Sequence, residues 1–111
     1  MFDDWSDGYA YTAPVGSYRP NPFGLYDVIG NAREHVADYW STFEGDPAKV
    51  LDNPTGPEDG RWRVIRGGGW FSGAGCNSLT RRNVLASTWG DFNVGFRCVR
   101  NVEEGGVIRD R

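Results

Sequence analysis

Glycines recur along the whole sequence, and large aromatic side chains stand between them. The 111 residues include 16 Gly together with five Trp, five Tyr and six Phe. Each buried ring removes a large apolar area from water, and glycine permits tight turns between the rings. The sequence therefore predicts a small domain in which loops dominate and aromatic packing orders the chain.

Length and charge exclude several classes of protein. The length suits one domain, residues 1–111, and is too short for two lobes with a cleft between them. No stretch approaches the roughly 20 apolar residues that a membrane span needs. Asp and Glu number 15 against 12 Lys and Arg, which argues against a nucleic-acid partner. The sequence leaves the cellular compartment open.

One segment has the pattern of a helix. Asn31 can act as an N-cap, and Glu34 follows it at the spacing of a capping box. The pattern predicts a helix of about ten residues. Its apolar stripe would consist of Val36, Ala37, Tyr39 and Trp40.

The remaining chain reads as loops and short strands. Prolines and glycines predict irregular structure over residues 1–22 and 44–60. Alternating charged and apolar residues predict a strand over 61–66 with one solvent-exposed face. Two further strands are expected, over 79–82 and 94–99.

Several apolar side chains are expected in the core. The glycine run 67–69 would let the backbone pass a neighbour where a Cβ would clash. Arg97 is expected to pair with a buried carboxylate or with carbonyls, because an unpaired buried guanidinium is costly, and Asp27 and Glu34 are the candidate carboxylates. The expected core residues are Phe23, Leu25, Tyr26, Trp70 and Phe96.

Three ordered blocks carry a resemblance to a known family. They are residues 21–35 (NPFGLYDVIGNAREH), 63–70 (RVIRGGGW) and 93–98 (NVGFRC). Together they resemble the formylglycine-generating enzyme or sulfatase-modifying factor family. The resemblance implies an α+β domain of the C-type-lectin type with little regular structure. Family enzymes are much longer, so the chain resembles their C-terminal half and is expected to be a fragment or a reduced form.

A calcium site is expected at Asp27, Gly30, Ala32 and Glu34. Two carboxylates that bracket a turn with free backbone carbonyls can surround one hard cation. The resemblance implies the same four positions, with carboxylates at Asp27 and Glu34 and carbonyls at Gly30 and Ala32. The alternative is that Glu34 only caps the predicted helix and pairs with Arg97.

The sequence departs from the family where copper would bind. The resemblance implies two cysteines, five residues apart, that hold copper as a bis-thiolate. Here Ser72 occupies the first position, and the second falls at Asn77, or at Cys76 after a one-residue deletion. The family serine after the paired glycines is Gly69, and a family tryptophan is Arg33. Soft Cu(I) needs both sulfurs, so we expect no copper and assign no catalytic residue.

Three other chemically notable side chains have structural interpretations. Cys98 is interpreted as a small buried hydrophobe at a strand end, and it could bridge to Cys76 only if the loop and final strand adjoin. His35 lacks a nearby catalytic partner and is interpreted as a half-buried packing residue. Trp89, among small polar residues, is expected to be exposed.

Two functions from different classes remain. The first is a non-catalytic binding module for a protein or a glycan, with contacts on the loops 71–77 and 83–92. The layout from Gly68-Gly69-Trp70 to Gly95-Phe96-Arg97 is also similar to the variable proteins of diversity-generating retroelements. The second is a formylglycine-generating or related metal-dependent oxidoreductase, or a fragment of one. The candidate ligand contacts are Phe71, Ser72, Asn77, Trp89 and Phe92.

Overall fold

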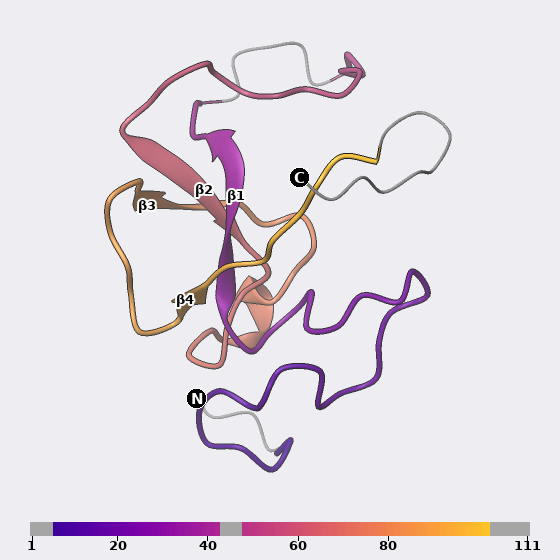
Figure 1. Cartoon of the computed structure of the whole chain (residues 1–111). Coiled ribbons are helices and arrows are strands. Elements are labelled where there is room, and N and C mark those ends of the chain that lie inside the picture. The colour runs from indigo at the N-terminus through magenta and orange to yellow at the C-terminus, as the bar shows by residue number, and fades with distance from the viewer. Residues whose placement is uncertain (1–5, 43–47, 103–111) are drawn as a thin grey trace.

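A four-stranded sheet organises the fold, with strand order β3-β2-β1-β4 (Figure 1). The computed structural model describes residues 6–42 and 48–102. Strands β1 and β2 pair antiparallel, as do β2 and β3, whereas β1 and β4 run parallel. The elements are β1 (Arg33–Tyr39), β2 (Trp62–Arg66), the 3-10 helix η1 (Ala74–Cys76), β3 (Asn83–Ala86) and β4 (Val94–Gly95).

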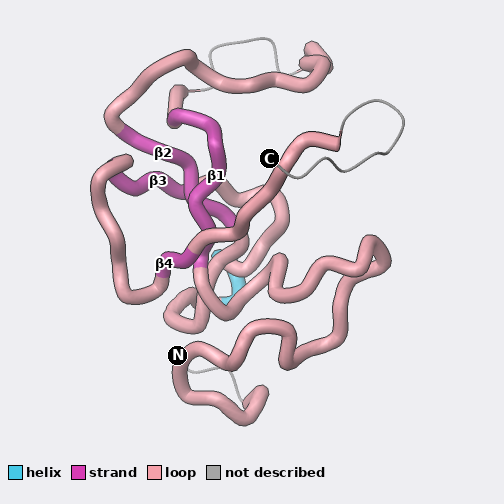
Figure 2. The backbone as a smooth tube through the Cα atoms, viewed as in Figure 1, coloured by secondary structure: helices cyan, strands magenta, loops and turns pink. Residues whose placement is uncertain are grey.

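Loops make up most of the described chain, as the composition predicts (Figure 2). In the view of Figure 1 residues 6–32, before β1, loop below the sheet, and residues 48–61, before β2, cross above it. The strands of the expected α+β class are present, but the described ranges hold one 3-10 helix and no α-helix. The predicted loops 1–22 and 44–60 are irregular wherever the structure describes them, and residues 1–5 and 43–47 lie outside that part.

The helix predicted from Asn31 is wrong, because this segment forms β1 (Arg33–Tyr39). Asn31 has a φ of 60°, which is not the backbone of an N-cap. Its side chain binds the backbone of Ala13, with an N···Oδ1 distance of 2.9 Å. The Glu34 carboxylate is held by Arg97. The sheet offers this segment ladder partners on both sides, and these replace the helical hydrogen bonds.

The prediction of a strand at 61–66 is confirmed by β2 (Trp62–Arg66), although its central residues are buried on both faces. Val64 is 1% exposed and Ile65 is 2% exposed. Successive strand residues point to opposite faces, so the sheet is covered on both sides here. The expected solvent-exposed face is therefore wrong at these two positions.

The glycine run after β2 passes its neighbours as closely as the sequence predicts. A Cβ on Gly67 would lie 2.9 Å from the carbonyl oxygen of Val28. A Cβ on Gly68 would overlap Oδ1 of Asn77. Both glycines also have positive φ, 90° and 68°, which L side chains rarely adopt. The run thus packs closely against Val28, in the loop before β1, and against Asn77, in the loop after Trp70.

The strands predicted over 79–82 and 94–99 do not have the predicted bounds. No strand covers 79–82; β3 (Asn83–Ala86) pairs with β2 instead. The carbonyl of Leu79 is bound by the side chain of Arg66, so it is not available to a ladder. Only Val94–Gly95 of the predicted strand 94–99 is paired, and the chain then leaves the sheet.

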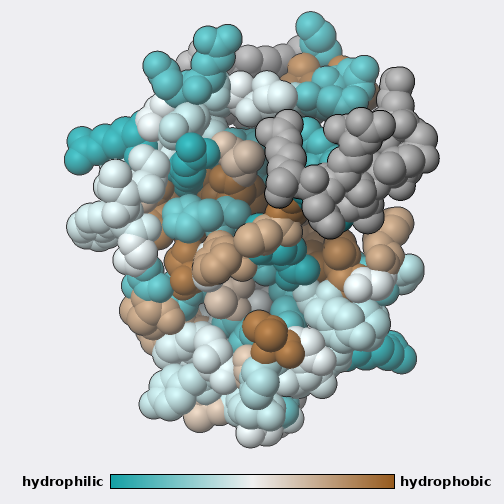
Figure 3. Space-filling model, viewed as in Figure 1, coloured by the Kyte–Doolittle hydropathy of each residue, from teal (hydrophilic) through white to brown (hydrophobic). Residues whose placement is uncertain are grey.

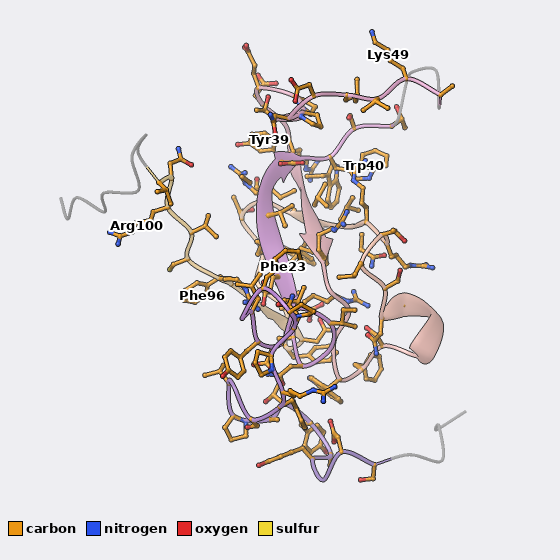
Figure 4. All side chains as sticks on the ribbon, turned by 90° about the vertical axis from the view of Figure 1, so that its right-hand side faces the viewer. Phe23, Tyr39, Trp40, Lys49, Phe96 and Arg100 are labelled. Atoms are coloured by element: carbon orange, nitrogen blue, oxygen red, sulfur yellow. The ribbon has the colours of Figure 1, made fainter. Side chains whose placement is uncertain are left out.

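Most of the predicted aromatic core lies at the surface. Phe96 is 82% exposed, and Figure 4 shows its side chain directed away from the sheet. Trp70 is half-buried. In the described part of the chain the buried apolar side chains are those of Ala13, Val64 and Ile65. The predicted core residues that are exposed are Phe23, Leu25, Tyr26 and Phe96.

The described residues contain no helix with the length and hydropathy of a membrane span.

Candidate functional site

Four aromatic side chains from three separate segments meet at the surface. The centroid of the Tyr11 ring lies 4.9 Å from that of Trp70, in an edge-to-face arrangement. The rings of Phe71 and Phe92 lie 5.5 and 5.7 Å from Trp70. Phe71 and Phe92 also meet each other edge to face at 5.6 Å. We call Tyr11, Trp70, Phe71 and Phe92 the aromatic cluster.

The aromatic cluster is open to solvent around a half-buried centre. Trp70 is half-buried, whereas Tyr11, Phe71 and Phe92 are 68, 67 and 66% exposed. Edge-to-face pairing is a favourable geometry for rings, and it leaves ring faces free for another molecule. The cluster therefore combines a fixed arrangement with a large apolar contact area.

Asn31 ties two segments of the cluster together. Its carbonyl accepts a hydrogen bond from the backbone N–H of Trp70 at 2.8 Å. Its side-chain amide accepts from the N–H of Ala13 at 2.9 Å and donates to the carbonyl of Ala13 at 3.2 Å. Ala13 is two residues from Tyr11. The left-handed backbone of Asn31 thus fixes Tyr11 beside Trp70.

Arg33 and Ser72 hold the segments that carry the two phenylalanines. Nη2 of Arg33 donates to Oγ of Ser72 at 3.2 Å, and the N–H of Gly69 donates to the same oxygen at 3.1 Å. The backbone N–H of Arg33 donates to the carbonyl of Asn93 at 2.8 Å. Asn93 is buried and directly follows Phe92. One residue of β1 thus supports the loops that present Phe71 and Phe92.

The five predicted ligand contacts have different positions in the structure. Phe71 and Phe92 lie together in the aromatic cluster. Trp89 is 69% exposed, as predicted, and its backbone closes a turn onto Ala86. Ser72 and Asn77 are half-buried, and Oδ1 of Asn77 is buried without a hydrogen-bond partner among the described residues.

The predicted contacts omit four residues of this site: Tyr11, Asn31, Arg33 and Trp70. Tyr11 belongs to the aromatic cluster, but no spacing in the sequence connects it to Trp70. Arg33 donates a hydrogen bond to Ser72. The only indication in the sequence that Arg33 belongs to a site was that it stands where the family has a tryptophan. Buried polar atoms are usually hydrogen-bonded, but Nε of Arg33 has no partner in the described ranges.

A second feature is an open pocket of about 410 Å³ beside β4. Arg97 and Glu34 form a two-bond ion pair in its wall, with Nε to Oε2 at 2.9 Å and Nη2 to Oε1 at 2.8 Å. Nη2 also donates to the carbonyl of Tyr26 at 2.7 Å. The hydrogen bond to Glu34 raises the pKa of Arg97 above its usual value. Of the two carboxylates expected as partners of Arg97, Glu34 is the one that pairs with it.

The pocket also brings together three of the four predicted calcium ligands, Asp27, Ala32 and Glu34. Carboxylate and carbonyl oxygens suit a hard cation, so the donor set fits calcium in kind. Oδ2 of Asp27 already accepts from the backbone N–H of Gly16 at 2.7 Å. Both oxygens of Glu34 are bound to Arg97, so a cation would share this carboxylate with a guanidinium.

Cys76 and Cys98 are both free thiols. Cys98 is exposed, so its interpretation as a buried hydrophobe is wrong; β4 ends before it. His35 is half-buried on β1, as predicted, and its Nδ1 has no partner among the described residues.

Comparisons with known proteins agree on one family. Residues 1–102 match the family described as sulfatase-modifying factor enzyme 1-like domain. The formylglycine-generating enzyme of Thermomonospora curvata is 41% identical over 107 residues, covering 88% of this chain. The structure of PvdO from Pseudomonas aeruginosa superimposes with a TM-score of 0.69 at 37% identity over 82% of the chain. Treponema denticola variable protein 1 gives 0.69 at 29% identity over 78%.

The relatives are much longer than this chain. The matched region is 34% of the Thermomonospora enzyme, 34% of PvdO and 31% of the Treponema protein. The fold of these neighbours is the C-type-lectin-like fold of the formylglycine-generating enzyme type, and this chain shares it over the matched part.

Proposed function

The chain belongs to the family of sulfatase-modifying factor enzyme 1-like domains, and from this premise we propose that it is a non-catalytic binding module for a protein or a glycan. The observation that carries the proposal is the aromatic cluster. Phe71 and Phe92 were expected as ligand contacts, and they meet at 5.6 Å while about two-thirds of each remains exposed.

The physical properties of the cluster suit this role. Rigid aromatic side chains lose little conformational entropy on binding, and they dominate the energetics of interfaces. Hydrogen bonds through Asn31 and Arg33 fix the loops that present the rings. Trp89, also exposed, would extend the contact area, whereas Ser72 and Asn77 would act mainly by holding the loops.

A library screen tests the proposal. Wild-type chain is applied to a glycan array and to a displayed random-peptide library, and its hits are compared with those of a Phe71→Ala/Phe92→Ala double variant. The matched control is Phe23→Ala, which removes another exposed ring outside the cluster. Loss of the hits only in the double variant supports the proposal. Hits that survive in the double variant contradict it.

The likeness to Treponema denticola variable protein 1 favours a narrower form of this function. In this narrower function, the residues between Trp70 and Gly95 would differ among variants of the protein, while the rest of the domain stays constant. Phe71, Phe92 and Trp89 all lie in this interval. The neighbouring DNA tests it: a reverse-transcriptase gene with a near-repeat of the segment encoding residues 66–97 supports it, and an ordinary single-copy locus contradicts it.

Calcium is the cofactor we propose, with Asp27, Glu34 and the carbonyls of Gly30 and Ala32 as ligands. Asp27, Ala32 and Glu34 line one pocket, which supports the assignment. When bound, the ion would join the loop before β1 to β1 itself. We propose no copper site, because Ser72 stands where the first family cysteine would be and its Oγ is bound to Arg33 and Gly69.

The second candidate function is formylglycine generation or a related metal-dependent oxidation. The 41% identity to a formylglycine-generating enzyme favours it. The discriminating assay incubates the chain with copper and a peptide that carries a Cys-x-Pro-x-Arg motif. Conversion of the peptide cysteine, seen by mass spectrometry, would replace the binding-module proposal with this one.

A further inference from the structure

Strand β3 lies at one edge of the four-stranded sheet. In the described part of the chain β2 is the only strand beside it, and Figure 1 shows β2 between β3 and β1. The backbone groups on the outer side of such a strand have no ladder partner. An edge of this kind is therefore a template on which a segment of another chain can pair.

The pairing register identifies the backbone groups of β3 that point outward. In an antiparallel pair, hydrogen-bonded residue pairs alternate with pairs that are not hydrogen-bonded. The N–H of Ser87, directly after β3, donates to the carbonyl of Arg61 at 3.0 Å. By this alternation the backbone of Leu85 faces β2, and the backbones of Val84 and Ala86 face away from it.

The outer edge of β3 offers both donors and an acceptor. The carbonyl of Ala86 accepts from the N–H of Trp89 at 2.9 Å, which closes the turn after β3. The N–H of Ala86 and both the N–H and the carbonyl of Val84 point to the outer edge. Val84 is also 40% exposed. A residue opposite Val84 can therefore exchange two backbone hydrogen bonds with it.

Positive charge is concentrated beside this edge. Arg81 and Arg82 directly precede β3 and are both exposed. Arg66, at the end of β2, donates a hydrogen bond to the carbonyl of Leu79. None of these three guanidinium groups pairs with a carboxylate in the described ranges. Figure 3 shows strongly hydrophilic residues (teal) over the part of the surface where Figure 1 places β2 and β3. The whole chain has a net charge of −3, so this concentration is local.

The register also determines what charge a partner needs. Arg66 and Arg82 are each one residue beyond the last pair of the ladder, Ile65 with Asn83. Two like charges thus stand at opposite positions, which is unfavourable. A carboxylate from a partner would neutralise this charge through charge-assisted hydrogen bonds, which are among the stronger ones. The occupant that fits this edge is therefore acidic.

We propose that β3 docks an extended acidic segment of a partner protein, which adds to the sheet as a further strand. Backbone hydrogen bonds to Val84 and Ala86 hold the segment, and Arg81 and Arg82 select acidic side chains at one end of it. The segment runs antiparallel to β3, because antiparallel pairing is the more stable per residue. This inference goes beyond the proposed function, because no residue of the aromatic cluster belongs to β3.

Binding of designed peptides tests the proposal. The probe is a fluorescein-labelled Thr-Val-Thr-Glu-Glu peptide. In antiparallel pairing its Val lies opposite Val84 and its acidic residues lie opposite Arg82 and Arg81. Fluorescence anisotropy measures its binding to the full chain. We expect it to bind at least tenfold more tightly than Thr-Val-Thr-Lys-Lys, because the arginines repel lysine side chains.

Methylation of the peptide backbone separates strand addition from attraction between charges. A methyl group on the backbone nitrogen of the peptide Val removes the donor to the carbonyl of Val84 and should weaken binding at least tenfold. A methyl group on the backbone nitrogen of the next Thr, which points away from β3, should leave binding within threefold.

Variants of the chain provide the second arm of the test. The Arg81→Glu/Arg82→Glu double variant should weaken binding at least tenfold. Arg19→Glu, a charge reversal at an exposed site before β1, should leave it within threefold. Val84→Pro removes one outward N–H and should also weaken binding, and proline is accepted in an edge strand when its nitrogen faces solvent.

Three results would overturn the inference. They are no binding of the acidic peptide to wild type, equal binding of the peptide methylated at Val, and a dimer of the chain that Val84→Pro dissociates. The second would indicate an anion site without an added strand, and the third would mean that a second copy covers the edge. If circular dichroism shows that Val84→Pro does not fold, the methylated peptides decide. The Phe71→Ala/Phe92→Ala double variant should bind the peptide as wild type does, so failure of the aromatic cluster as a ligand site leaves this inference standing.

Discussion

Arg97 binds Glu34 through two parallel hydrogen bonds of 2.9 and 2.8 Å, and it thereby joins the segment after β4 to the start of β1. The two side chains are 31 and 26% exposed. Charge-assisted bonds in this paired geometry are among the stronger ones, but partial exposure screens them. The pair stabilises the contact of β4 with β1, which is otherwise only two residue pairs long.

Arg97→Ala should therefore destabilise the fold by about 1–3 kcal/mol, as judged by urea unfolding. Loss of the bond to the carbonyl of Tyr26 contributes to this effect. A double-mutant cycle with Glu34→Gln should give a coupling energy of about 1 kcal/mol. Additive effects of the two substitutions would mean that the pair contributes no stability.

The glycines after β2 should be strongly sensitive to a methyl group. Gly67→Ala and Gly68→Ala each place a Cβ on a positive-φ backbone and against a neighbour, so each should cost at least about 2 kcal/mol. Gly73→Ala is the matched control, because a Cβ there has no atom within 4 Å and the backbone carries no positive φ. Equal stability of Gly67→Ala and Gly73→Ala would show that the backbone does not approach Val28 this closely.

Ring truncations should distinguish the half-buried centre of the aromatic cluster, Trp70, from exposed rings inside and outside the cluster. Trp70→Ala should cost about 2–4 kcal/mol, because Trp70 is half-buried and contacts the other three rings. Phe71→Ala, Trp89→Ala and Phe96→Ala should each change stability by no more than about 0.5 kcal/mol, since their side chains are mainly exposed. Thermal denaturation measures all four. Unfolding by Trp89→Ala as severe as by Trp70→Ala would place Trp89 in the core.

Calcium should raise the melting temperature, because a ligand that binds only the native state stabilises it. The gain approaches about 2.7 kcal/mol at a concentration 100 times the Kd. Asp27→Asn should lose the response while it keeps the pairing of Glu34 with Arg97. Equal melting midpoints in calcium and in chelator would contradict the calcium proposal.

Tyr18 should lose its proton at an unusually high pH. Desolvation and a hydrogen bond to Asp7 raise its pKa to about 12. Because this value lies above that of an unfolded tyrosine, the stabilisation by Tyr18 is present below about pH 10 and is lost as the pH rises through about 12. The difference in tyrosinate absorbance between wild type and Tyr18→Phe measures the pKa. Asp7→Asn should lower it, and an unchanged curve would show that the bond to Asp7 has no effect.

Local patterns predicted some features of the fold correctly. The alternation at 61–66 indicated β2, and the glycine run marked a close approach. The cost of burying a guanidinium predicted that Arg97 pairs with a carboxylate or carbonyls, with Asp27 and Glu34 as candidates, and the partners are Glu34 and the carbonyl of Tyr26. In each case the deciding interaction could be reasoned from residue type and a short segment.

Tertiary contacts overrode local signals elsewhere. Asn31 and Glu34 have the spacing of a capping box, but their side chains bind Ala13 and Arg97. The meeting of Tyr11 with Trp70 depends on the path of the loop before β1, and no periodicity in the sequence reports it. Phe23, Tyr26 and Phe96, which were expected in the core, lie at the surface, and the buried apolar side chains of the described residues are those of Ala13, Val64 and Ile65.

The parallel pairing of β1 with β4 has a consequence for synthesis. Arg33 pairs with Val94 and Glu34 with Gly95, so the sheet joins residues that are far apart in the sequence. A nascent chain that ends before β4 lacks one neighbour of β1 and the guanidinium that binds Glu34. Contacts of such long sequence separation slow folding, because loop closure must precede them. The sheet therefore completes only after residues 93–97 have left the ribosome, and until then an edge of β1 is available to other chains.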